Sequence, residues 1–351
     1  MSNSIETYKK VIESFKNKLC IVTGGTGLIG RQLVDFLVNE SKAQVIVLSL
    51  DDVQPVPGAE YRKVDLCNYA EVMANITDGI DYVFHLAGIK GSIEVTKSRP
   101  ATFFVPYLKF NTNVLEAARL CKTLKGLVYT SSIGAYSSAE VFIEGENEDG
   151  APMDTFPGWA KRMAELQIDA YRKEYGLKNF HVTRPCNVYG PGDNFDPENA
   201  MVIPSLMYKI NEYKKSDQKT PIQIWGDGSA IRDFAYSRDV AVGVMHAMYY
   251  GTYVVNVQTG KYTNYINLGS GVGITIAELV ETLHRVIGGF EYTFDTSKPS
   301  GFPKRIMSME MAKKAIKFEP HTSLEQGLQI TWDWFKENET EYLHKKNYFK
   351  D

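Results

Sequence analysis

The chain has 351 residues, of which 44% are hydrophobic and 23% are charged, and its formal net charge is −3. This length suffices for one large α/β unit or for two domains, and the composition is typical of a globular protein. The small net charge gives no indication of nucleic-acid or membrane-surface binding, and we expect neither partner. The four scattered cysteines, at positions 20, 67, 121 and 186, lack metal-site spacing and predict reduced thiols in the cytoplasm.

The N-terminal segment predicts a helix rather than an export signal. Apolar residues recur at helical spacing between Ile5 and Phe15, and Ser4 could cap the helix. Glu6 and Glu13 interrupt the apolar stretch that a signal peptide would need. We therefore expect an additional helix docked on the body of the protein.

A glycine-rich turn follows the first predicted strand. The apolar run 19–22 is followed by three spaced glycines, and an apolar helical pattern begins at Leu28. Strand, glycine turn and helix in this order are typical of a dinucleotide-binding βαβ unit, in which the helix N-terminus faces the pyrophosphate. The three glycines serve different purposes, namely a tight turn, close approach to the phosphates, and packing of the helix on the strand. The expected cofactor contacts here are Gly24, Thr26, Gly27, Leu28, Ile29 and Gly30.

The second predicted strand, 44–50, ends in acidic residues. Asp51 and Asp52 lie about twenty residues beyond the last glycine, where an acid would accept a hydrogen bond from the adenosine ribose. No Lys or Arg occurs between positions 43 and 61 to bind a 2′-phosphate. The pattern favours NAD over NADP, with Asp51 as the ribose ligand.

Strands and helices continue to alternate along the first half of the chain. Further strands are expected at 63–66, 81–88 and 126–132, and a helix at 111–120. Such alternation predicts the α/β class, with a Rossmann-type doubly wound parallel sheet. The stretch 240–260 lacks Lys, Arg, Asp and Glu, but its polar residues and glycines favour a buried helix followed by a strand over a membrane span.

These motifs resemble those of the extended short-chain dehydrogenase/reductases, the NAD-dependent epimerase/dehydratase family, that act on nucleotide sugars. The second half is most similar to the GDP-fucose synthases, and the resemblance covers roughly residues 18–335. It is carried by Thr23–Gly30, Asp65-Leu66, His85–Gly88, Thr130–Ser132, Lys161 and Arg184–Pro191, and then by Gly190–Pro197, Val202–Pro204, Ile224–Gly228, Arg232–Phe234, Asn267–Gly273 and Phe294–Pro299.

The resemblance implies a catalytic Ser132 and Lys161. In the family, a serine and a tyrosine bind the sugar oxygen that alternates between hydroxyl and ketone, and the lysine lowers the pKa of the tyrosine and holds the nicotinamide ribose. The further cofactor contacts that it implies are Asp65, Leu66, Leu86, Ala87, Gly88 and Lys161.

The tyrosine of the family is missing. Pro157 stands four residues before Lys161, and no tyrosine lies between positions 137 and 170. Three alternatives follow: the proton acceptor is water ordered by Lys161 and Ser132, it is a tyrosine from elsewhere such as Tyr136 or Tyr189, or the protein binds its ligand without catalysis. Because both the cofactor and the sugar-side motifs remain, we favour an enzyme.

Two further departures narrow the expected reaction. In the GDP-fucose synthases, a cysteine after the active serine and a histidine before the Val-Ile-Pro run exchange protons at the sugar ring. Here the segment 132–136 contains no cysteine, and Met201 stands at the place of the histidine. A thioether cannot carry a proton, so we expect simple redox chemistry at one sugar carbon rather than double epimerisation.

The second half of the chain supplies the expected substrate contacts. Arg232 resembles the diphosphate-binding arginine of the family, Lys304 and Arg305 add positive charge nearby, and core packing is the alternative for the apolar candidates. The expected substrate residues are Asn187, Val202, Trp225, Arg232 and Lys298.

We expect an NAD-binding domain over 1–190 plus about 236–260, and a smaller α/β nucleotide-sugar-binding domain over 191–235 and 261–351. The predicted function is an NAD-dependent oxidoreductase acting at carbon 4 of a GDP-linked hexose or heptose in surface-polysaccharide biosynthesis. A nucleotide-sugar 4-epimerase and a catalytically silent binder are the alternatives. Relatives pair through two helices, here 107–122 and 160–175, so a homodimer or homotetramer is expected.

Overall fold

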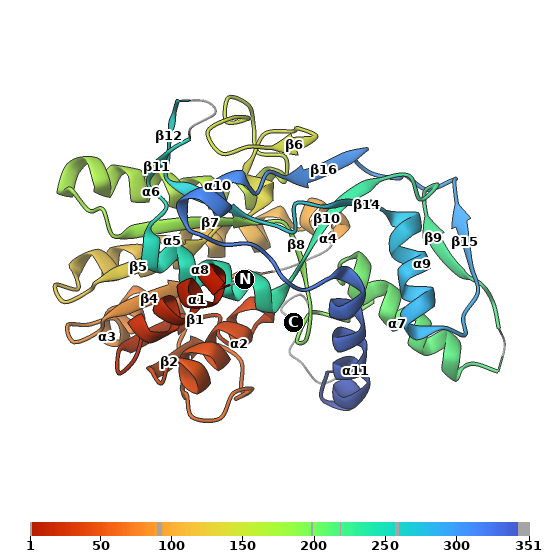
Figure 1. The fold of residues 1–351 in the computed structure, drawn as a ribbon, viewed down its shortest axis with the longest axis horizontal. Helices are drawn as coiled ribbons and strands as arrows, with labels where there is room; N and C mark the ends of the chain where they lie inside the picture. The colour runs from red at the N-terminus through yellow and green to blue at the C-terminus, as the bar shows by residue number, and fades with distance from the viewer. Residues whose placement is uncertain (1, 90–92, 198, 218, 257–259, 343–351) are drawn as a thin grey trace.

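The computed structural model describes residues 2–89, 93–197, 199–217, 219–256 and 260–342. Its centre is a parallel seven-stranded sheet in the order β13–β7–β5–β4–β1–β2–β3 (Figure 1). The strands are β1 (Leu19–Thr23), β2 (Gln44–Ser49), β3 (Glu60–Lys63), β4 (Tyr82–His85), β5 (Gly126–Thr130), β7 (Phe180–Pro185) and β13 (Tyr265–Leu268). Inner strands such as β5 are buried along their whole length, as expected for a parallel sheet that is covered on both faces.

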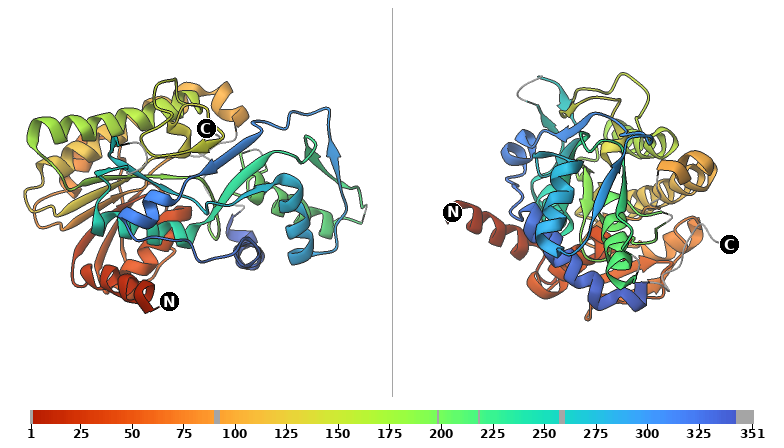
Figure 2. Two further views of the ribbon diagram at one scale, coloured as in Figure 1. Left: turned by 45° about the horizontal axis from the view of Figure 1, so that its top comes forward. Right: turned by 90° about the vertical axis from the view of Figure 1, so that its right-hand side faces the viewer.

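Helices cover both faces of this sheet, and Figure 2 shows the two layers. One layer holds α3 (Tyr69–Asn75), α5 (Pro100–Leu120) and α6 (Thr155–Tyr175), with α5 and α6 in extensive contact. The other holds α2 (Leu28–Asp35), continued by the π-helical turn η1 (Phe36–Glu40), together with α8 (Ser237–Tyr250) and α1 (Ser2–Ser14). This arrangement confirms the predicted Rossmann-type fold.

The additional N-terminal helix is confirmed as α1. Val11 and Phe15 are buried in the main core, so the helix is docked on the body of the protein as expected. Ile5, in contrast, is 57% exposed, and α1 already begins at Ser2, so Ser4 lies inside the helix rather than before it. The expected helix and strand over 240–260 are α8 and β11 (Val254–Val255), the latter paired with β12 (Tyr262–Thr263).

The third strand lies earlier than predicted. β3 spans Glu60–Lys63, where no residue is buried, so it shows no apolar pattern. The apolar residues Val64 and Leu66 mark instead the turn that follows, because the carboxylate of Asp65 accepts a hydrogen bond from Cys67 N at 2.9 Å and closes it. An exposed edge strand can pair through its backbone alone, which leaves no trace in the sequence.

A second, smaller core forms beyond residue 188. It includes aromatic and aliphatic residues from Tyr189 to Phe335, and its helices are α7 (Val202–Lys215), α9 (Ile276–Ile287) and α11 (Leu324–Tyr342). Its strands are β8 (Asn187–Tyr189), β9 (Ile222–Trp225), β10 (Ile231–Tyr236), β14 (Gly273–Thr275), β15 (Tyr292–Asp295) and β16 (Lys304–Met307). Two segments expected here, β13 and α10 (Glu310–Ala315), instead pack in the main core, because β13 extends the large sheet beside β7.

Strand pairs connect the two cores. β10 pairs with β8, and β16 runs parallel to β6 (Val141–Phe142), a short strand that belongs to the main core (Figures 1 and 2). The chain therefore leaves and re-enters the main core several times, and both cores frame the carboxyl ends of the central strands. The remaining short elements are α4 (Ile93–Ser98) and the 3₁₀ turn η2 (Ile133–Ala135).

Candidate active site

The turn between β1 and α2 has the geometry that a dinucleotide pyrophosphate requires. Gly24 has φ +69°, and a Cβ at this position would lie 2.8 Å from backbone atoms of Ala87. A Cβ on Gly30 would overlap the carbonyl oxygen of Gly24. Gly27 precedes the first turn of α2, and a Cβ there would meet only one atom, Gly24 O at 3.3 Å. The outer side of Gly27 is therefore open, so these residues fit the diphosphate of a dinucleotide against the start of α2.

The two acids after β2 point in different directions. Thr26 Oγ1 donates to Asp51 Oδ2 at 2.6 Å, which holds this carboxylate at the glycine turn. Asp52 is exposed and accepts two hydrogen bonds of 2.9 Å from Lys63 on β3. Asp51 is thus the acid beside the glycine turn, where the expected ribose contact would be made.

A buried polar chain lies beneath the turn. His85 Nδ1 lies 2.7 Å from Thr23 Oγ1, and His85 Nε2 lies 2.9 Å from Asn111 Oδ1. Asn111 in turn donates to the hydroxyl of Tyr129 at 3.2 Å. Burial lowers the pKa of His85 to about 3, so this ring is neutral and structural. Thr23 Oγ1 also accepts a hydrogen bond from Ala87 N at 3.2 Å, so the chain fixes the turn that follows β4.

The remaining predicted cofactor residues lie at the same edge of the sheet. Leu86 N donates to Thr23 O at 3.2 Å, and a Cβ on Gly88 would lie 2.8 Å from the Tyr107 hydroxyl. Asp65 and Leu66 follow β3, the outermost strand on that side. Parallel strands end at one edge, and the order of the strands reverses between β1 and β4, where ligands of such sheets bind.

Ser132 and the Lys161 side chain both lie at the carboxyl end of β5. Lys161 Nζ donates to the carbonyl oxygens of Thr130 at 3.3 Å and Ser131 at 3.1 Å. Ser132 Oγ accepts from Gly134 N at 3.1 Å, which caps η2. Because β5 lies next to β4, both side chains are on the nicotinamide side of the expected dinucleotide.

Neither alternative tyrosine faces this site. Tyr136 is fully buried, and its hydroxyl donates to Asn267 Oδ1 at 2.8 Å. The hydroxyl of Tyr189 donates to Leu324 O at 3.3 Å inside the smaller core. Pro157 lies in the first turn of α6, one turn before Lys161. Both hydroxyls are thus bonded elsewhere in this structure, which disfavours the alternative of Tyr136 or Tyr189 as the proton acceptor.

An acid that the sequence did not single out occupies the site instead. Asp154 immediately precedes α6, and its carboxyl group lies where a Cβ of Gly134 would be. Its Oδ1 lies 3.9 Å from a guanidinium nitrogen of Arg305, which reaches across from the smaller core. Asp154 and Gly134 lie twenty positions apart in the sequence. The only sequence signal of their contact is that position 134 is a glycine, which leaves space for the carboxyl group.

The expected substrate residues separate into two groups. Arg232 on β10 and Arg305 on β16 are register partners, and Nε of Arg305 is buried without a hydrogen-bond partner among the described residues. Asn187 starts β8, and its side chain donates to Asp233 O at 3.0 Å. Both arginines and Asn187 lie where the two cores meet, on the path from β8 through β10 to β16.

Trp225 and Lys298 form the second group, further out on the smaller core. Trp225 is 55% exposed, so core packing does not explain it, and Lys298 Nζ lies 5.6 Å from the centre of its ring. Val202, in contrast, packs against the smaller core at the start of α7. The exposed ring beside a cation leaves an aromatic face available to a ligand.

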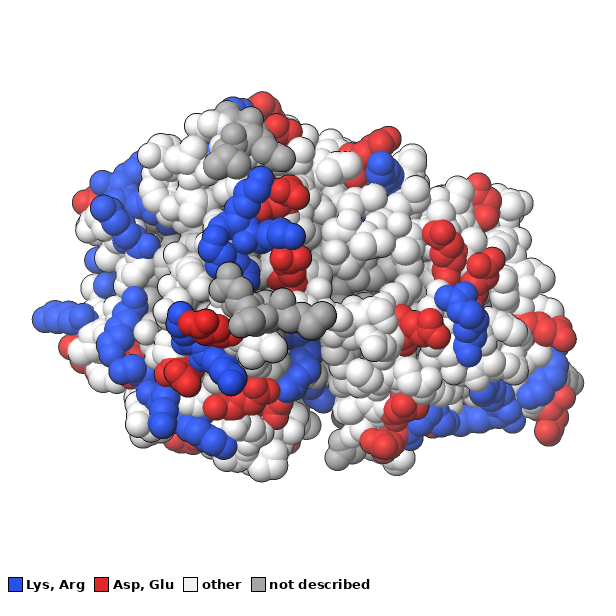
Figure 3. Space-filling view, viewed as in Figure 1, with Lys and Arg blue, Asp and Glu red and all other residues white. Residues whose placement is uncertain are grey.

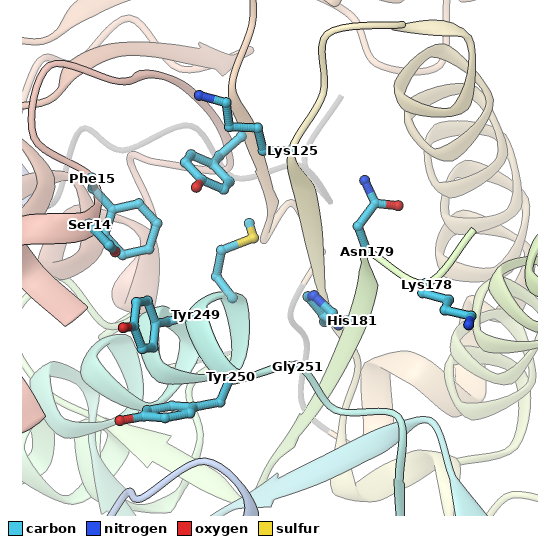
Figure 4. Close-up of a pocket in the computed structure, with 11 residues that line it drawn as sticks. Ser14, Phe15, Lys125, Lys178, Asn179, His181, Tyr249, Tyr250 and Gly251 are labelled. Carbon is cyan, nitrogen blue, oxygen red and sulfur yellow. The ribbon is translucent and has the colours of Figure 1, made fainter. Parts of the chain in front are cut away.

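A cavity lies at the opposite edge of the sheet. It has a volume of about 460 Å³, and Figure 4 shows Lys125, Asn179 and His181 on its wall. These residues lie at or near the amino ends of β5 and β7, far from the glycine turn at the carboxyl ends. Burial lowers the pKa of His181 to about 4, so this ring contributes no charge at neutral pH. We do not assign the cavity to the candidate active site.

The charges and cysteines agree with an ordinary globular surface. Figure 3 shows Lys and Arg mixed with Asp and Glu over one face of the molecule. All four cysteines are free thiols. Within the described ranges, no helix is both long and apolar enough to cross a membrane. The same residues contain no group of three or more His, Cys, Asp or Glu side chains that could hold a metal ion.

The central sheet and its glycine turn are those of an enzyme of the extended short-chain dehydrogenase/reductase class. The chain belongs to the NAD dependent epimerase/dehydratase family, whose model matches residues 20–257. It is 31% identical to the GDP-L-fucose synthase of Sinorhizobium fredii over 322 residues, which cover 90% of this chain and 95% of that protein. The GDP-L-fucose synthase of Escherichia coli is also 31% identical, over 76% of this chain and 83% of its own length.

Solved structures show the same architecture. The UDP-glucose 4-epimerase of Thermotoga maritima, determined with UDP-glucose, has a TM-score of 0.76 and 26% identity. The match covers 91% of this chain and 99% of that one. It therefore includes the smaller core as well as the central sheet.

Proposed function

We propose that this protein is an NAD-dependent oxidoreductase acting at carbon 4 of a GDP-linked hexose or heptose. The observation that supports the proposal most strongly is that Ser132, Lys161 and the glycine turn lie at one edge of the sheet. Arg305 of the smaller core reaches this edge, where it lies 3.9 Å from Asp154. GDP rests on the two GDP-L-fucose synthases described above. A cytoplasmic location and a role in surface-polysaccharide synthesis belong to the same proposal.

The residues would divide the work as follows. Gly24, Gly27 and Gly30 would hold the pyrophosphate of the dinucleotide, and Asp51 its adenosine ribose. A carboxylate there disfavours the 2′-phosphate of NADP, so we propose NAD. The bound nicotinamide supplies hydride acceptance or donation.

The chain's own polar groups would orient the sugar. Lys161 would hold the nicotinamide ribose and keep the site positively charged, and Ser132 Oγ would bind the reacting sugar oxygen. Arg232 and Arg305 are register partners on neighbouring strands, and burial together with the charge of Arg305 lowers the pKa of Arg232. Two neighbouring arginines are suited to binding a diphosphate. Burial lowers the pKa of Arg305, which means that the charged guanidinium is destabilised by its loss of water contacts. A bound anion would offset this destabilisation.

Simple redox chemistry is favoured over double epimerisation because the site lacks proton-exchanging side chains at two positions. Gly134 has no side chain, and Met201, 37% exposed before α7, offers only a thioether. Neither can exchange a proton at the carbons of the ring.

The missing tyrosine favours the second candidate, a nucleotide-sugar binder without turnover.

The test is to mix the purified protein with NAD and a panel of GDP-linked hexoses and heptoses and to follow absorbance of reduced nicotinamide. Lasting reduction supports the dehydrogenase. An altered sugar without net reduction indicates the 4-epimerase. If NAD is not reduced and the sugar is not altered, the protein is a binder without turnover. Calorimetry should show NAD binding at least about tenfold more tightly than NADP. Equal affinities would contradict the assignment of Asp51.

A further inference from the structure

The carboxyl group of Asp154 lies against Gly134, two residues after Ser132, in a candidate site that lacks the tyrosine of the family. Its side chain makes no capping hydrogen bond to α6, although the residue immediately before a helix usually does. The carboxyl group turns instead toward Gly134, whose amide binds the hydroxyl of Ser132. The side chain of Asp154 therefore lies beside the segment that carries Ser132 and does not make the capping hydrogen bond that would stabilise α6.

The backbone around Asp154 is arranged to allow this position. Thr155 has φ +45°, a left-handed conformation that is unfavourable for a β-branched residue. A Cβ on Gly134 would overlap the carboxyl group, and a Cβ on Gly158 would lie 2.5 Å from Gly134 O. Two side-chain-free positions and one strained residue therefore bring the start of α6 against η2, with the carboxyl group between them.

The surroundings of Asp154 suit a group that exchanges protons. Its side chain keeps 45% of its surface accessible, so a ligand can reach it, although protein atoms surround it closely enough for burial to raise its pKa. The charged groups that face it are Arg305 of β16 and Lys161, two turns along α6, and both oppose the rise. A carboxyl group with a raised pKa is a more effective base near neutral pH than an ordinary one.

We propose that Asp154 replaces the missing tyrosine and exchanges the hydroxyl proton of the reacting sugar carbon. The inference rests on the proposed function and deepens it. In the oxidation, the C–H bond breaks and its electron pair leaves as hydride to a nicotinamide, while the O–H bond breaks and its proton goes to an Asp154 carboxylate oxygen. The carbon–oxygen bond becomes a ketone, and the reduction runs through the same atoms in reverse.

The competing explanation is that Asp154 only neutralises Arg305. In that case its loss would alter binding of the diphosphate, and the rate at saturating substrate would remain. The Asp154→Asn variant separates the two, because it keeps the shape of the side chain and removes the charge and the proton acceptor. Asp149→Asn, an exposed acid in the preceding loop, is the matched control.

We expect Asp154→Asn to lower the rate of nicotinamide reduction at saturating substrate by about 10²-fold or more, the contribution of a positioned general base. Its affinity for GDP, measured by calorimetry, should stay within about threefold of the wild type. Asp149→Asn should match the wild type in both. A wild-type rate for Asp154→Asn, or a loss of GDP affinity alone, would overturn the inference.

A second variant tests the replacement directly. Pro157→Tyr in the Asp154→Asn background places a phenol one turn before Lys161, where the family has it. This double variant should recover much of the rate, with its pH profile moved to higher pH because a phenol titrates above a carboxyl group. If the double variant stays as inactive as Asp154→Asn, the two side chains are not interchangeable and the inference fails.

A measurement without turnover keeps this inference separable from the proposed function. In ¹³C-detected carboxyl titrations of the free protein, Asp154 should titrate above the usual aspartate range. Gly134→Ala, which displaces the carboxyl group, should return it to that range. An ordinary titration in the wild type contradicts the inference. If the wild type reduces NAD with none of the sugars, the proposed function fails; if wild type and Asp154→Asn reduce it equally, only the role of Asp154 fails.

Discussion

Two buried glutamates near the sheet are held in different ways. Glu165 pairs with Arg184, whose guanidinium is buried and lies between the rings of Tyr136 at 4.2 Å and Tyr265 at 3.6 Å. Glu144 Oε1 accepts a hydrogen bond from Asn267 N at 2.9 Å, and its Oε2 has no partner among the described residues. A buried carboxylate that lacks a partner is destabilised relative to its protonated form.

This difference predicts a pH dependence of stability. Burial raises the pKa of Glu144 to about 7 from its ordinary value near 4.5. Because the folded state holds this proton more tightly than the unfolded state, the contribution of Glu144 to stability is largest below pH 4.5 and is lost as pH rises through 7. Glu144→Gln should remove this loss and raise the free energy of unfolding at pH 8 by about 1–3 kcal/mol.

Urea denaturation at pH 5 and pH 8 measures the effect. Glu146→Gln, two residues further along the same loop, serves as the control and should behave like the wild type at both pH values. A Glu144→Gln variant that is less stable than the wild type at pH 8 would show that the carboxylate has a favourable partner, and the assignment of an unpaired acid would then be wrong.

The glycines of the first turn differ in what a side chain would meet. A Cβ on Gly27, which has φ −81°, would meet only the carbonyl oxygen of Gly24, at 3.3 Å, whereas a Cβ on Gly30 would overlap that oxygen. Gly27→Val should therefore abolish dinucleotide binding with little change in thermal stability, because the side chain fills the pyrophosphate position and no other. Gly30→Ala should lower stability itself. Calorimetry with NAD and thermal unfolding separate the two, and unchanged NAD binding by Gly27→Val would show that the turn binds no dinucleotide.

At the scale of the element, α6 has one side toward the candidate site and another side exposed to solvent. Lys161 lies on its inner side, and on its outer side an apolar stripe is exposed at helical spacing. The stripe consists of Phe156 (47% exposed), Trp159 (37%), Met163 (45%) and Leu166 (56%). Val105 on the neighbouring α5 is also 44% exposed. An apolar stripe of this size is typical of a helix that packs on a partner, which supports the expected pairing through α5 and α6.

Leu166→Glu tests this pairing, because it places a charge in the middle of the stripe. Its expected result is a monomer in analytical ultracentrifugation at a concentration at which the wild type is a dimer or larger. Ile330→Glu is the control. Ile330 is 46% exposed on α11, a helix that packs on the smaller core, and its substitution should leave the assembly unchanged. If the wild type sediments as a monomer, α6 is not the interface.

The elements of the main core could be predicted because their signals are local. The apolar runs of β1, β2, β4 and β5 and the spaced glycines are contiguous in the sequence, and each matches one element. Ser132 and Lys161 became candidates only through the resemblance to the family, because a serine after a strand and a lysine in a helix are not distinctive by themselves. Their proximity follows from the rule that parallel strands end at one edge.

The rest depends on contacts between distant residues. Nothing near Asp154 indicates that Gly134 makes room for it, and neither the Thr23–His85–Asn111 chain nor the pairing of β16 with β6 leaves a local pattern. Trp225 shows the same limit, because an exposed and a buried tryptophan look alike in the sequence of a strand. These features are set by tertiary packing, which a single sequence does not display.

At the scale of the whole molecule, one buried carboxylate ties the segments that join the two cores. Asp233 on β10 is fully buried and accepts hydrogen bonds from Ser270 N at 2.8 Å, Gly271 N at 3.1 Å and Met307 N at 3.2 Å. These donors belong to the turn after β13 and to β16. Asp233 thus fixes the strand that carries Arg232 relative to the strand that carries Arg305.

Asp233→Asn should loosen this junction. An amide in place of the carboxylate turns one acceptor into a donor that faces backbone N–H groups, which leaves buried donors unpaired and costs about 2–4 kcal/mol of unfolding free energy. Because the donors come from segments that connect the cores, we expect the smaller core to unfold at a lower urea concentration than the main core. Three of the four tryptophans, Trp225, Trp332 and Trp334, lie in the smaller core, and Trp159 lies on α6. In an Asp233→Asn, Trp159→Phe double variant, tryptophan fluorescence should then change before the far-ultraviolet circular dichroism of the whole chain. Asp52→Asn, at an exposed ion pair, is the control and should unfold like the wild type. Coincident transitions for Asp233→Asn at the wild-type midpoint would show that the junction is held by strand pairing alone.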